Sequence, residues 1–588
     1  MRIRPLASFV MVLGCLQAFT VLAGAQEPLT AFPEDTGAVL RIASIDKLTG
    51  GFKEMIGGLG PVAAIVGPQI EVGLAQALQL GTTVEGVDRA APAFVAVFPM
   101  EGQSAEPVAW MVKASDENKL RRAVVKATAD EALAAESVAG GFEKIVSKGT
   151  GTWFFGRHGE LVLYTRSSDV HQLLVSCRGA EKTFATLVEP RAAQLLEAGD
   201  AAVLVNAAHL TKLYGKPLEL AREQAVRQIE GLSDDSLGGG GANAQAARRL
   251  YLQLANLAFD AVADARWAAG RLNFNASGVS AAAVLAVKEG SASDLLFASS
   301  PPTNFENLGL LPAGAAAYYG YFSKAPALAR NYIQSADEEI AKRLEAARDE
   351  ASQAGAGPTV GSFALPADAR SGTIAITLQQ AEKPDALRAS NRKFQAAVGE
   401  VKTPIFTQST EYQEAAESYH DRPVDILTTK FELAKTDDQG LQIAQQFLQQ
   451  LFGGESLQTR VTTLEGLLVQ SSGNDPKYIH EVVDRLGTGE GVLGLSEAYA
   501  KSRDQLADEA NLVVMLNLPQ LIVDVVKLLR GVPAIAPFLT QVPFNFGVQP
   551  EVSFAGFSAG TERQGVGLHV FVPIAQPKGV LQIFGQGL

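Results

Sequence analysis

The sequence predicts an α+β fold of two tandem similar halves, each with antiparallel sheets and helices packed on one face. Three observations support this prediction. Short runs of β-forming residues alternate with helix-like patterns along the whole chain. These runs are spaced too irregularly for regular βαβ units. The same order of patterns occurs twice, in residues 37–310 and in residues 314–588.

The first 25 residues have the three-part layout of a secretory signal. Arg2 and Arg4 give a positive start, and the stretch from residue 5 to residue 22 is uncharged and mostly apolar. The small residues before Gln26 then form a cleavage site. We therefore expect cleavage after Ala25 and an exported protein, periplasmic or at the cell surface.

Two alternatives for this terminus stay open. Residues 12–15 resemble a lipobox, in which Cys15 would carry a lipid. The apolar run is also about long enough to remain as a membrane anchor. In every case we expect residues 26–36 to form a loose leader before the first half.

Four segments share one pattern, a short apolar run followed by a break and then apolar residues three and four apart. Each predicts a strand, a short turn and a helix. The segments are residues 37–56, 200–220, 314–333 and 511–529.

The stretches between these segments also match in pairs. Asp116 and Asp385 suit helix starts, where a carboxylate can accept backbone N–H groups. The pairs are 107–127 with 372–394, 159–176 with 464–486, 181–210 with 489–521, and 271–287 with 552–574. Because these pairs follow the same order in both halves, a tandem duplication is the simplest explanation.

Glycine-rich and proline-rich stretches predict loops. Four consecutive glycines lie in residues 237–244, where regular structure would cost much backbone entropy. Residues 299–303 and 355–362 have turn compositions. The charged stretch 336–353 reads as a helix with a solvated face, because opposite charges recur four residues apart.

Composition excludes several classes of protein. The net charge is −13, and it becomes −15 when Arg2 and Arg4 leave with the signal, so a basic nucleic-acid footprint is absent. The two cysteines are Cys15 and Cys177, so a mature chain holds one thiol and cannot form an internal disulfide. No later apolar stretch reaches the roughly 20 residues that a membrane span needs.

A sequence motif that occurs twice resembles one found in a known family. Phe184 to Leu187 form a short link, and a strand then ends in Asn206 with Leu210 four positions on. The second occurrence ends in Asn517 with Leu521. With this motif, the sequence resembles a family of exported bacterial proteins known only as a domain of unknown function. The resemblance covers most of the mature chain and implies no catalytic residues.

The stretch around residue 168 contains the side chains of a hydrolytic site. Ser167, Ser168, Asp169 and His171 lie within five positions. On a helix that starts at Asp169, however, His171 would face about 200° away from it. We therefore interpret this stretch as a strand, a serine turn and a helix that Asp169 caps.

Other candidates also favour structural roles. No two histidines have metal-ligand spacing, and we expect surface or capping positions for His158 and His171. The glycines of 487–494 follow a helix, so Gly487 is expected to end it. We expect Cys177 to act as a small buried hydrophobe. The six histidines are His158, His171, His209, His420, His480 and His569.

The sequence thus favours an exported, non-enzymatic structural or binding protein. A carrier of a lipid-like apolar ligand and a hydrolase with a dispersed active site stay open as alternatives. In a structural or binding protein, the apolar helix 518–530 would be buried between sheets. In a carrier, it would line a groove for the ligand. We predict no catalytic, cofactor-binding or metal-binding residue, and a cell-envelope protein or a lipid-like molecule as partner.

Overall fold

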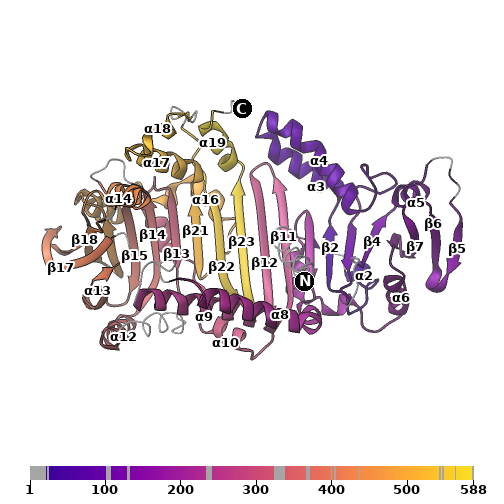
Figure 1. The fold of residues 1–588 in the computed structure, drawn as a ribbon, viewed down its shortest axis with the longest axis horizontal. Coiled ribbons are helices and arrows are strands. Elements are labelled where there is room, and N and C mark those ends of the chain that lie inside the picture. Colours follow the sequence, from indigo (N-terminus) through magenta and orange to yellow (C-terminus); the bar gives the residue numbers. More distant parts are fainter. Residues whose placement is uncertain are drawn as a thin grey trace.

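One antiparallel sheet runs through the whole molecule, with helices at both ends of its strands (Figure 1). The predicted α+β class with antiparallel pairing is confirmed. The structure is a computed structural model. It describes residues 21–22, 26–100, 107–128, 131, 133–233, 242–323, 338–365, 371–398, 400–402, 406–435, 437–541, 544–545, 549–562 and 564–585.

Some described strands alternate between buried and less buried positions, whereas others, such as β4 and β10, are buried along most of their length. They are β1 (Val21–Leu22), β2 (Ala38–Ile42), β3 (Ala93–Val97), β4 (Val108–Lys113), β5 (Ala135–Val138), β6 (Phe142–Ser147), β7 (Gly151–His158), β8 (Leu161–Thr165), β9 (Leu196–Glu197), β10 (Ala201–Val205), β11 (Ala265–Asn275), β12 (Gly278–Val287), β13 (Ala317–Tyr321), β14 (Ala356–Ala364), β15 (Ile374–Ala381), β16 (Val401–Lys402), β17 (Phe406–Tyr419), β18 (Arg422–Leu433), β19 (Ser456–Leu464), β20 (Leu467–Ser472), β21 (Leu512–Leu516), β22 (Ala555–Glu562) and β23 (Gly565–Pro573).

The described helices mostly follow strands. They are α2 (Gln26–Leu29), α3 (Ile45–Gly57), α4 (Pro61–Ala77), α5 (Glu117–Val125), α6 (Ser168–Cys177), α7 (Pro190–Leu195), α8 (Ala207–Glu230), α9 (Ala242–Asp264), α10 (Ala292–Ala298), α12 (Glu338–Gln353), α13 (Pro384–Val398), α14 (Gln439–Phe452), α15 (Lys477–Thr488), α16 (Glu497–Arg503), α17 (Leu518–Arg530), α18 (Ala536–Leu539) and α19 (Ala575–Ile583). Short 3₁₀ turns are η1 (Ala139–Gly141), η2 (Phe184–Leu187), η4 (Glu306–Leu310) and η5 (Leu493–Leu495). Among the described residues, no helix is both long and apolar enough to cross a bilayer.

The middle of the sheet is the antiparallel pair β12 and β23, in which Ala282 lies opposite His569. On one side of this pair the strands follow in the order β12, β11, β10, β2, β3, β4, β8, β7, β6 and β5. On the other side they follow in the order β23, β22, β21, β13, β14, β15, β20, β19, β18 and β17. The sheet is therefore continuous across residues that the sequence assigned to separate sheets.

Helices pack on both faces of the sheet, which corrects the prediction of one covered face. On β4, Met111 joins a buried cluster with α2, α6 and α7, whereas Trp110 joins a second cluster with α3, α4 and α5. The reason lies in the composition of β4, VAWMVK, which is apolar at successive positions. A strand of this kind needs cover on both sides.

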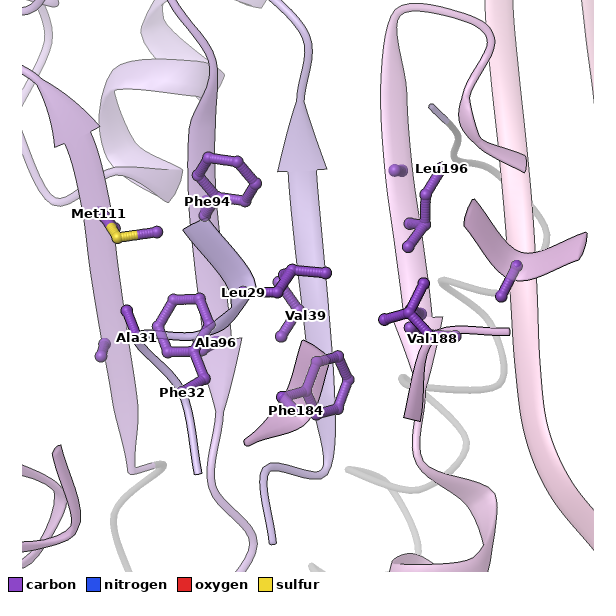
Figure 2. Close-up of a cluster of buried hydrophobic side chains, with 14 of the residues drawn as sticks. Leu29, Ala31, Phe32, Val39, Phe94, Ala96, Met111, Phe184, Val188 and Leu196 are labelled. Carbon is purple, nitrogen blue, oxygen red and sulfur yellow. The ribbon is translucent and has the colours of Figure 1, made fainter. Parts of the chain in front are cut away.

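The leader expected to be loose is part of the core. Leu29 and Phe32 are buried, and Figure 2 shows them against strands that carry Val39 and Phe94. The ring of Phe32 meets that of Phe98 edge-on, with centroids 6.4 Å apart. Burying such side chains stabilises the fold by about 2 kcal/mol each, which explains why the leader docks. The docked leader therefore begins with α2, which directly follows the predicted cleavage position, whereas β1 pairs with β9 and lies before that position.

Most predicted strand–turn–helix segments are confirmed. They correspond to β2 with α3, β10 with α8, and β21 with α17. The third segment gives β13, but residues 324–333, where its helix was expected, lie outside the described residues. The four-glycine loop, residues 238–241, also lies outside them.

The prediction of a loop at residues 355–362 is wrong, because β14 crosses this stretch between β13 and β15. One glycine of β14, Gly361, lies against a ring of the neighbouring strand β13. A Cβ on Gly361 would lie 2.4 Å from the Tyr319 ring and hydroxyl, so only glycine leaves room there.

The predicted helix starts are confirmed in one case and shifted in the other. Asp116 caps α5 by accepting the N–H of Lys119. Asp385 lies in the first turn of α13 and instead accepts a hydrogen bond from the Thr463 hydroxyl.

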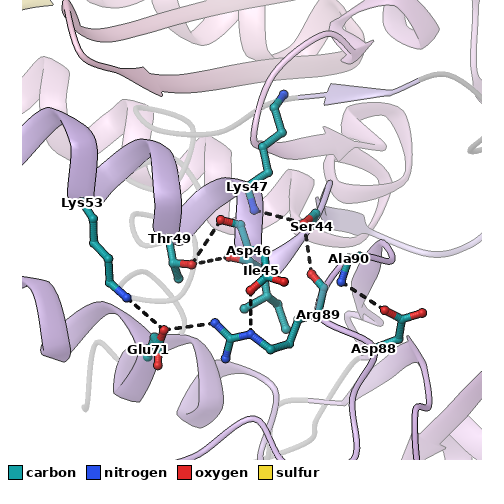
Figure 3. Close-up of polar contacts among 10 residues, drawn as sticks. All are labelled: Ser44, Ile45, Asp46, Lys47, Thr49, Lys53, Glu71, Asp88, Arg89 and Ala90. Atoms are coloured by element: carbon teal, nitrogen blue, oxygen red, sulfur yellow. Dashed lines mark hydrogen bonds and ion pairs between the residues drawn. The ribbon is translucent and has the colours of Figure 1, made fainter.

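A polar network fixes α3 and α4 over the first half of the sheet (Figure 3). Ser44 caps α3, and its hydroxyl donates to the carbonyl of Arg89. The Arg89 guanidinium in turn pairs with Asp46 of α3 at 2.6 Å and with Glu71 of α4 at 3.0 Å. Both helices are thereby tied to the loop that precedes β3.

Candidate functional site

The serine-rich stretch at the start of α6 is a helix cap. Ser167 accepts the backbone N–H of Val170 and is the capping residue. The prediction that Asp169 caps this helix is therefore wrong, and Asp169 lies in the first turn instead. The reason is that a serine two residues earlier already fills the cap position, while the carboxylate still favours the positive end of the helix.

His171 is buried, which corrects its expected surface or capping position. Its ring stacks on Phe154 with centroids 4.5 Å apart and meets Phe142 edge-on at 4.9 Å. Its Nε2 lies 3.3 Å from the carbonyl oxygen of Ala139. The imidazole therefore fills an aromatic core and does not face Ser168 or Asp169.

The other histidines are spread over the molecule. His158 lies at the end of β7, and His209 lies in α8 with its Nδ1 3.5 Å from Asp35. His420 lies 2.9 Å from Asp484, and the ring of His480 stacks on Tyr419 next to it. In the part of the chain that the structure describes, no group of three or more His, Cys, Asp or Glu is placed to hold a metal ion.

The glycine-rich stretch after α15 is a helix stop, as expected, but at a different glycine. Gly487 still lies within α15, and Gly489 is the left-handed capping residue with φ +71°. A glycine serves there because the left-handed conformation is strained for other residues.

A pocket of about 600 Å³ lies between the leader, the end of β7, the C-terminus of α6 and η2. Its inner wall includes Leu163, Leu174 and the buried Cys177. The Cys177 thiol donates to the carbonyl of Thr30 at 3.6 Å, and burial raises its pKa. This bears out the expected buried role of Cys177, because a neutral thiol in contact with leucines is a poor nucleophile.

The rim of this pocket is polar. Arg157, His158 and Arg178 lie on it together with Glu181. The Nε2 atom of His158 lies 3.1 Å from the Thr30 hydroxyl. The rim is therefore joined to the leader, and the pocket exists only while the leader is docked.

The apolar helix 518–530 forms as predicted, as α17, but it is not sandwiched between sheets. It packs against α19, α14 and α18 beyond the strand ends. Gln576 of α19 accepts the N–H of Leu518, and a Cβ on Gly579 would lie 2.7 Å from Pro519. One side of α17 is thus buried, while Leu521 and Val525 remain partly exposed.

The outward side of the middle strands is apolar and uncovered. On β23, Phe571 is buried on one face, whereas Leu568 and Val570 on the other are 39% and 37% exposed. Neighbouring strands show the same alternation, since β21 buries Val513 and leaves Leu512 36% exposed. An antiparallel strand normally turns polar residues toward water, so apolar residues on this side require another explanation.

We call this surface the central face. It combines side chains of five adjacent strands, β12, β23, β22, β21 and β13, placed on one side by the strand register. In Figure 1, α8 and α9 cross one end of these strands, and α3, α4 and α17 to α19 lie at the other end. The residues of the central face are Ala281, Ala283, Val566, Leu568, Val570, Val572, Phe557, Ala559, Leu512, Val514, Tyr319 and Tyr321.

Sequence reasoning did not find the central face. The signal was present in GVGLHVFVP of β23 and AYYGY of β13, where both alternating sets of positions carry apolar residues. Such a strand predicts cover on both faces. Which of the two faces lacks its cover depends on helix packing, which the strand sequence does not record.

No family model, curated protein or solved structure matches the chain.

Proposed function

We propose that this chain is an exported, non-enzymatic binding protein whose central face holds a lipid-like apolar ligand. The central face carries the proposal, because its side chains are apolar at the positions that should meet water. A large contiguous patch of exposed apolar residues usually marks a binding site, whereas single scattered apolar residues do not. The signal-like first 25 residues support export.

The form of the face fits an elongated ligand. Val570 of β23 lies opposite Phe557 of β22, Leu568 lies two positions before it on β23, and Tyr321 adds an aromatic ring that is 52% exposed. An alkyl chain that lies across these strands would gain about 0.8 kcal/mol of transfer free energy for each methylene group that it buries. The partly exposed residues of α17 at the strand ends would continue this apolar surface, as expected of a helix that lines a groove.

Mass spectrometry under native conditions tests the proposal on protein purified from its own host. We expect a retained mass that organic extraction removes and that identifies as a lipid. A protein with no bound mass, at any loading of added lipid, contradicts the proposal. A stable dimer by light scattering, with no lipid, would assign the face to a second copy of the chain instead.

Two substitutions locate the ligand. Leu568→Lys and Val570→Lys place charges on the central face and should abolish the fluorescence gain of bound N-phenylnaphthylamine. The matched control is Val146→Lys, because Val146 is 67% exposed on β6, away from this face. Equal losses in all three variants would show that the dye does not report on the central face.

We also propose that residues 37–310 and 314–588 are two tandem similar halves. The matching strand orders on either side of the β12–β23 pair support this. Local details support it as well: Asn206 and Asn517 cap the helices after β10 and β21. Isolated bridges also correspond, because Pro33, just before the first half, pairs with Thr183, and Pro312, just before the second half, pairs with Val492.

A further inference from the structure

The pocket beside α6 is separate from the central face. Leu163 and Leu174, which line it, belong to the cluster that contains Met111 and Ala282. Ala282 is turned to the side of the sheet opposite Ala281 and Ala283 of the central face. Whatever occupies the pocket is therefore a second ligand, and the inference goes beyond the proposed function.

Positive charge predominates on the rim. Arg157 and Arg178 face a single lining carboxylate, that of Glu181. Arg157 already pairs with Glu117. Arg178 lies over the ring of Phe142 at 5.0 Å and donates to the carbonyl of Arg157 at 3.0 Å. Among the ion pairs of the described residues, none involves Arg178, so its charge remains available to a ligand.

The inner wall is apolar and unreactive. Leu163, Leu174 and Ala185 supply alkyl surface, and the Cys177 thiol is held by its contact with the Thr30 carbonyl. The volume of about 600 Å³ lies within the usual range of small-molecule pockets, roughly 300–1,000 Å³. The site therefore offers an apolar wall below and a guanidinium at the mouth.

We propose that this pocket binds a small anionic amphiphile, a monocarboxylate with a short alkyl chain. The carboxylate lies at Arg178, where the guanidinium can donate two hydrogen bonds. The alkyl chain lies against Leu163 and Leu174 and covers the Cys177 thiol. Because Thr30 forms part of the wall, the bound carboxylate also holds the leader in place.

Cys177 reports on occupancy. The experiment measures the slow alkylation of the buried Cys177 thiol by N-ethylmaleimide over long incubation of the full chain, read by peptide mass spectrometry so that Cys15 is counted separately. Octanoate at ten times its Kd should slow alkylation roughly tenfold. Octanol should protect less, and octyltrimethylammonium should not protect. Equal protection by the anion and the cation, or protection by neither, would overturn the proposal.

Three variants distinguish an effect of side-chain charge on octanoate binding from an effect of misfolding. Arg178→Gln should weaken octanoate about threefold, and Glu181→Gln should tighten it about twofold, the range expected for exposed charges. Lys182→Gln is the matched control, because Lys182 is exposed beside the pocket but does not line it. A misfolded variant cannot gain affinity, so unchanged binding in Glu181→Gln would contradict the assignment even if Arg178→Gln proves unstable.

One more variant keeps the two proposals independent. Leu568→Lys alters the central face and should leave octanoate protection of Cys177 unchanged. Loss of protection in Leu568→Lys would mean that octanoate acts from the central face, and it would overturn the assignment of the pocket.

Discussion

Strands β10 and β21 occupy the same place in the sheet, third from its middle on either side, yet they differ in burial. All five residues of β10, AAVLV, are buried. In β21, LVVML, only Val513 and Met515 are buried. Each strand ends in an asparagine that caps the next helix, Asn206 or Asn517. Strand sequence and pairing alone therefore do not decide which faces of this sheet are closed.

The difference comes from the helices. Val203 and Val205 of β10 pack with Leu210, the residue of α8 that turns back onto the sheet. Helix α17, which follows β21, packs against α19 and α14 instead. The same outward face is thus covered in the first case and forms the central face in the second.

The largest expected effect comes from one substitution made at both places. Val203→Lys puts an ammonium group into a closed core, and we expect it to lower the free energy of unfolding by about 3 kcal/mol or more. Val514→Lys, at the matching position of β21, should cost about 1 kcal/mol or less, because the lysine can reach water. Urea unfolding followed by circular dichroism measures both. Equal losses would mean that β21 is covered in solution.

A substitution of intermediate effect tests the Arg89 ion pairs that hold α3 and α4 over the first half of the sheet. Arg89→Ala removes the ion pairs to Asp46 and Glu71, and it should lower the free energy of unfolding by about 1 kcal/mol. We expect faster hydrogen exchange in α3 and α4. The control is Lys501→Ala, which removes one exposed pair with Glu497 and should change the free energy of unfolding less than Arg89→Ala does. Unchanged exchange in α3 and α4 would show that apolar packing alone holds them.

The smallest effect is a difference in pH response between the two regions. Hydrogen bonds from Lys53 and Arg89 hold the pKa of Glu71 below its ordinary value of 4.5. Glu71 therefore stabilises the fold above pH 4.5, and this is lost as pH falls through the lowered pKa. In α17, desolvation holds the pKa of Asp524 above 3.8, so its ionisation costs stability as pH rises through the raised pKa.

Paired amide variants measure these opposite signs. At neutral pH we expect Glu71→Gln to lower the free energy of unfolding in urea and Asp524→Asn to raise it, each by a few tenths of about 1 kcal/mol. Both differences should shrink as the pH is lowered and the carboxyl groups of Glu71 and Asp524 become protonated. Shifts of the same sign in both variants would rule out this explanation.

The sequence predicted local structure better than the way elements combine. The strands and helices near residues 107–127 and 518–530 follow from apolar spacing, and they formed as expected. The prediction for residues 26–36 failed because Leu29 and Phe32 are too few to show periodicity, although both are buried. Gly361 suggested a loop, but it makes room for Tyr319 across the sheet. Contacts between distant residues decided each of these cases.

The same limit applied to the sites. Ser168, Asp169 and His171 suggested a site because they are close in sequence. In the structure, however, the ring of His171 points into a cluster of aromatic side chains. The pocket combines Thr30 with Arg157 and Cys177, which lie far apart in the chain. No spacing rule connects such residues, so the sequence could identify Cys177 as buried but not as part of a cavity wall.

The position of β23 has a consequence for synthesis. The strand beside β12 in the middle of the sheet is supplied by residues 565–573, near the end of the chain. Until those residues are delivered, β12 has an open edge, GVSAAAVLAV, without a single charge. Uncharged edges of this kind recruit other strands and aggregate. The middle of the sheet therefore closes only when residues 565–573 are present, and a chain interrupted before residue 565 should be a substrate for chaperones or proteases.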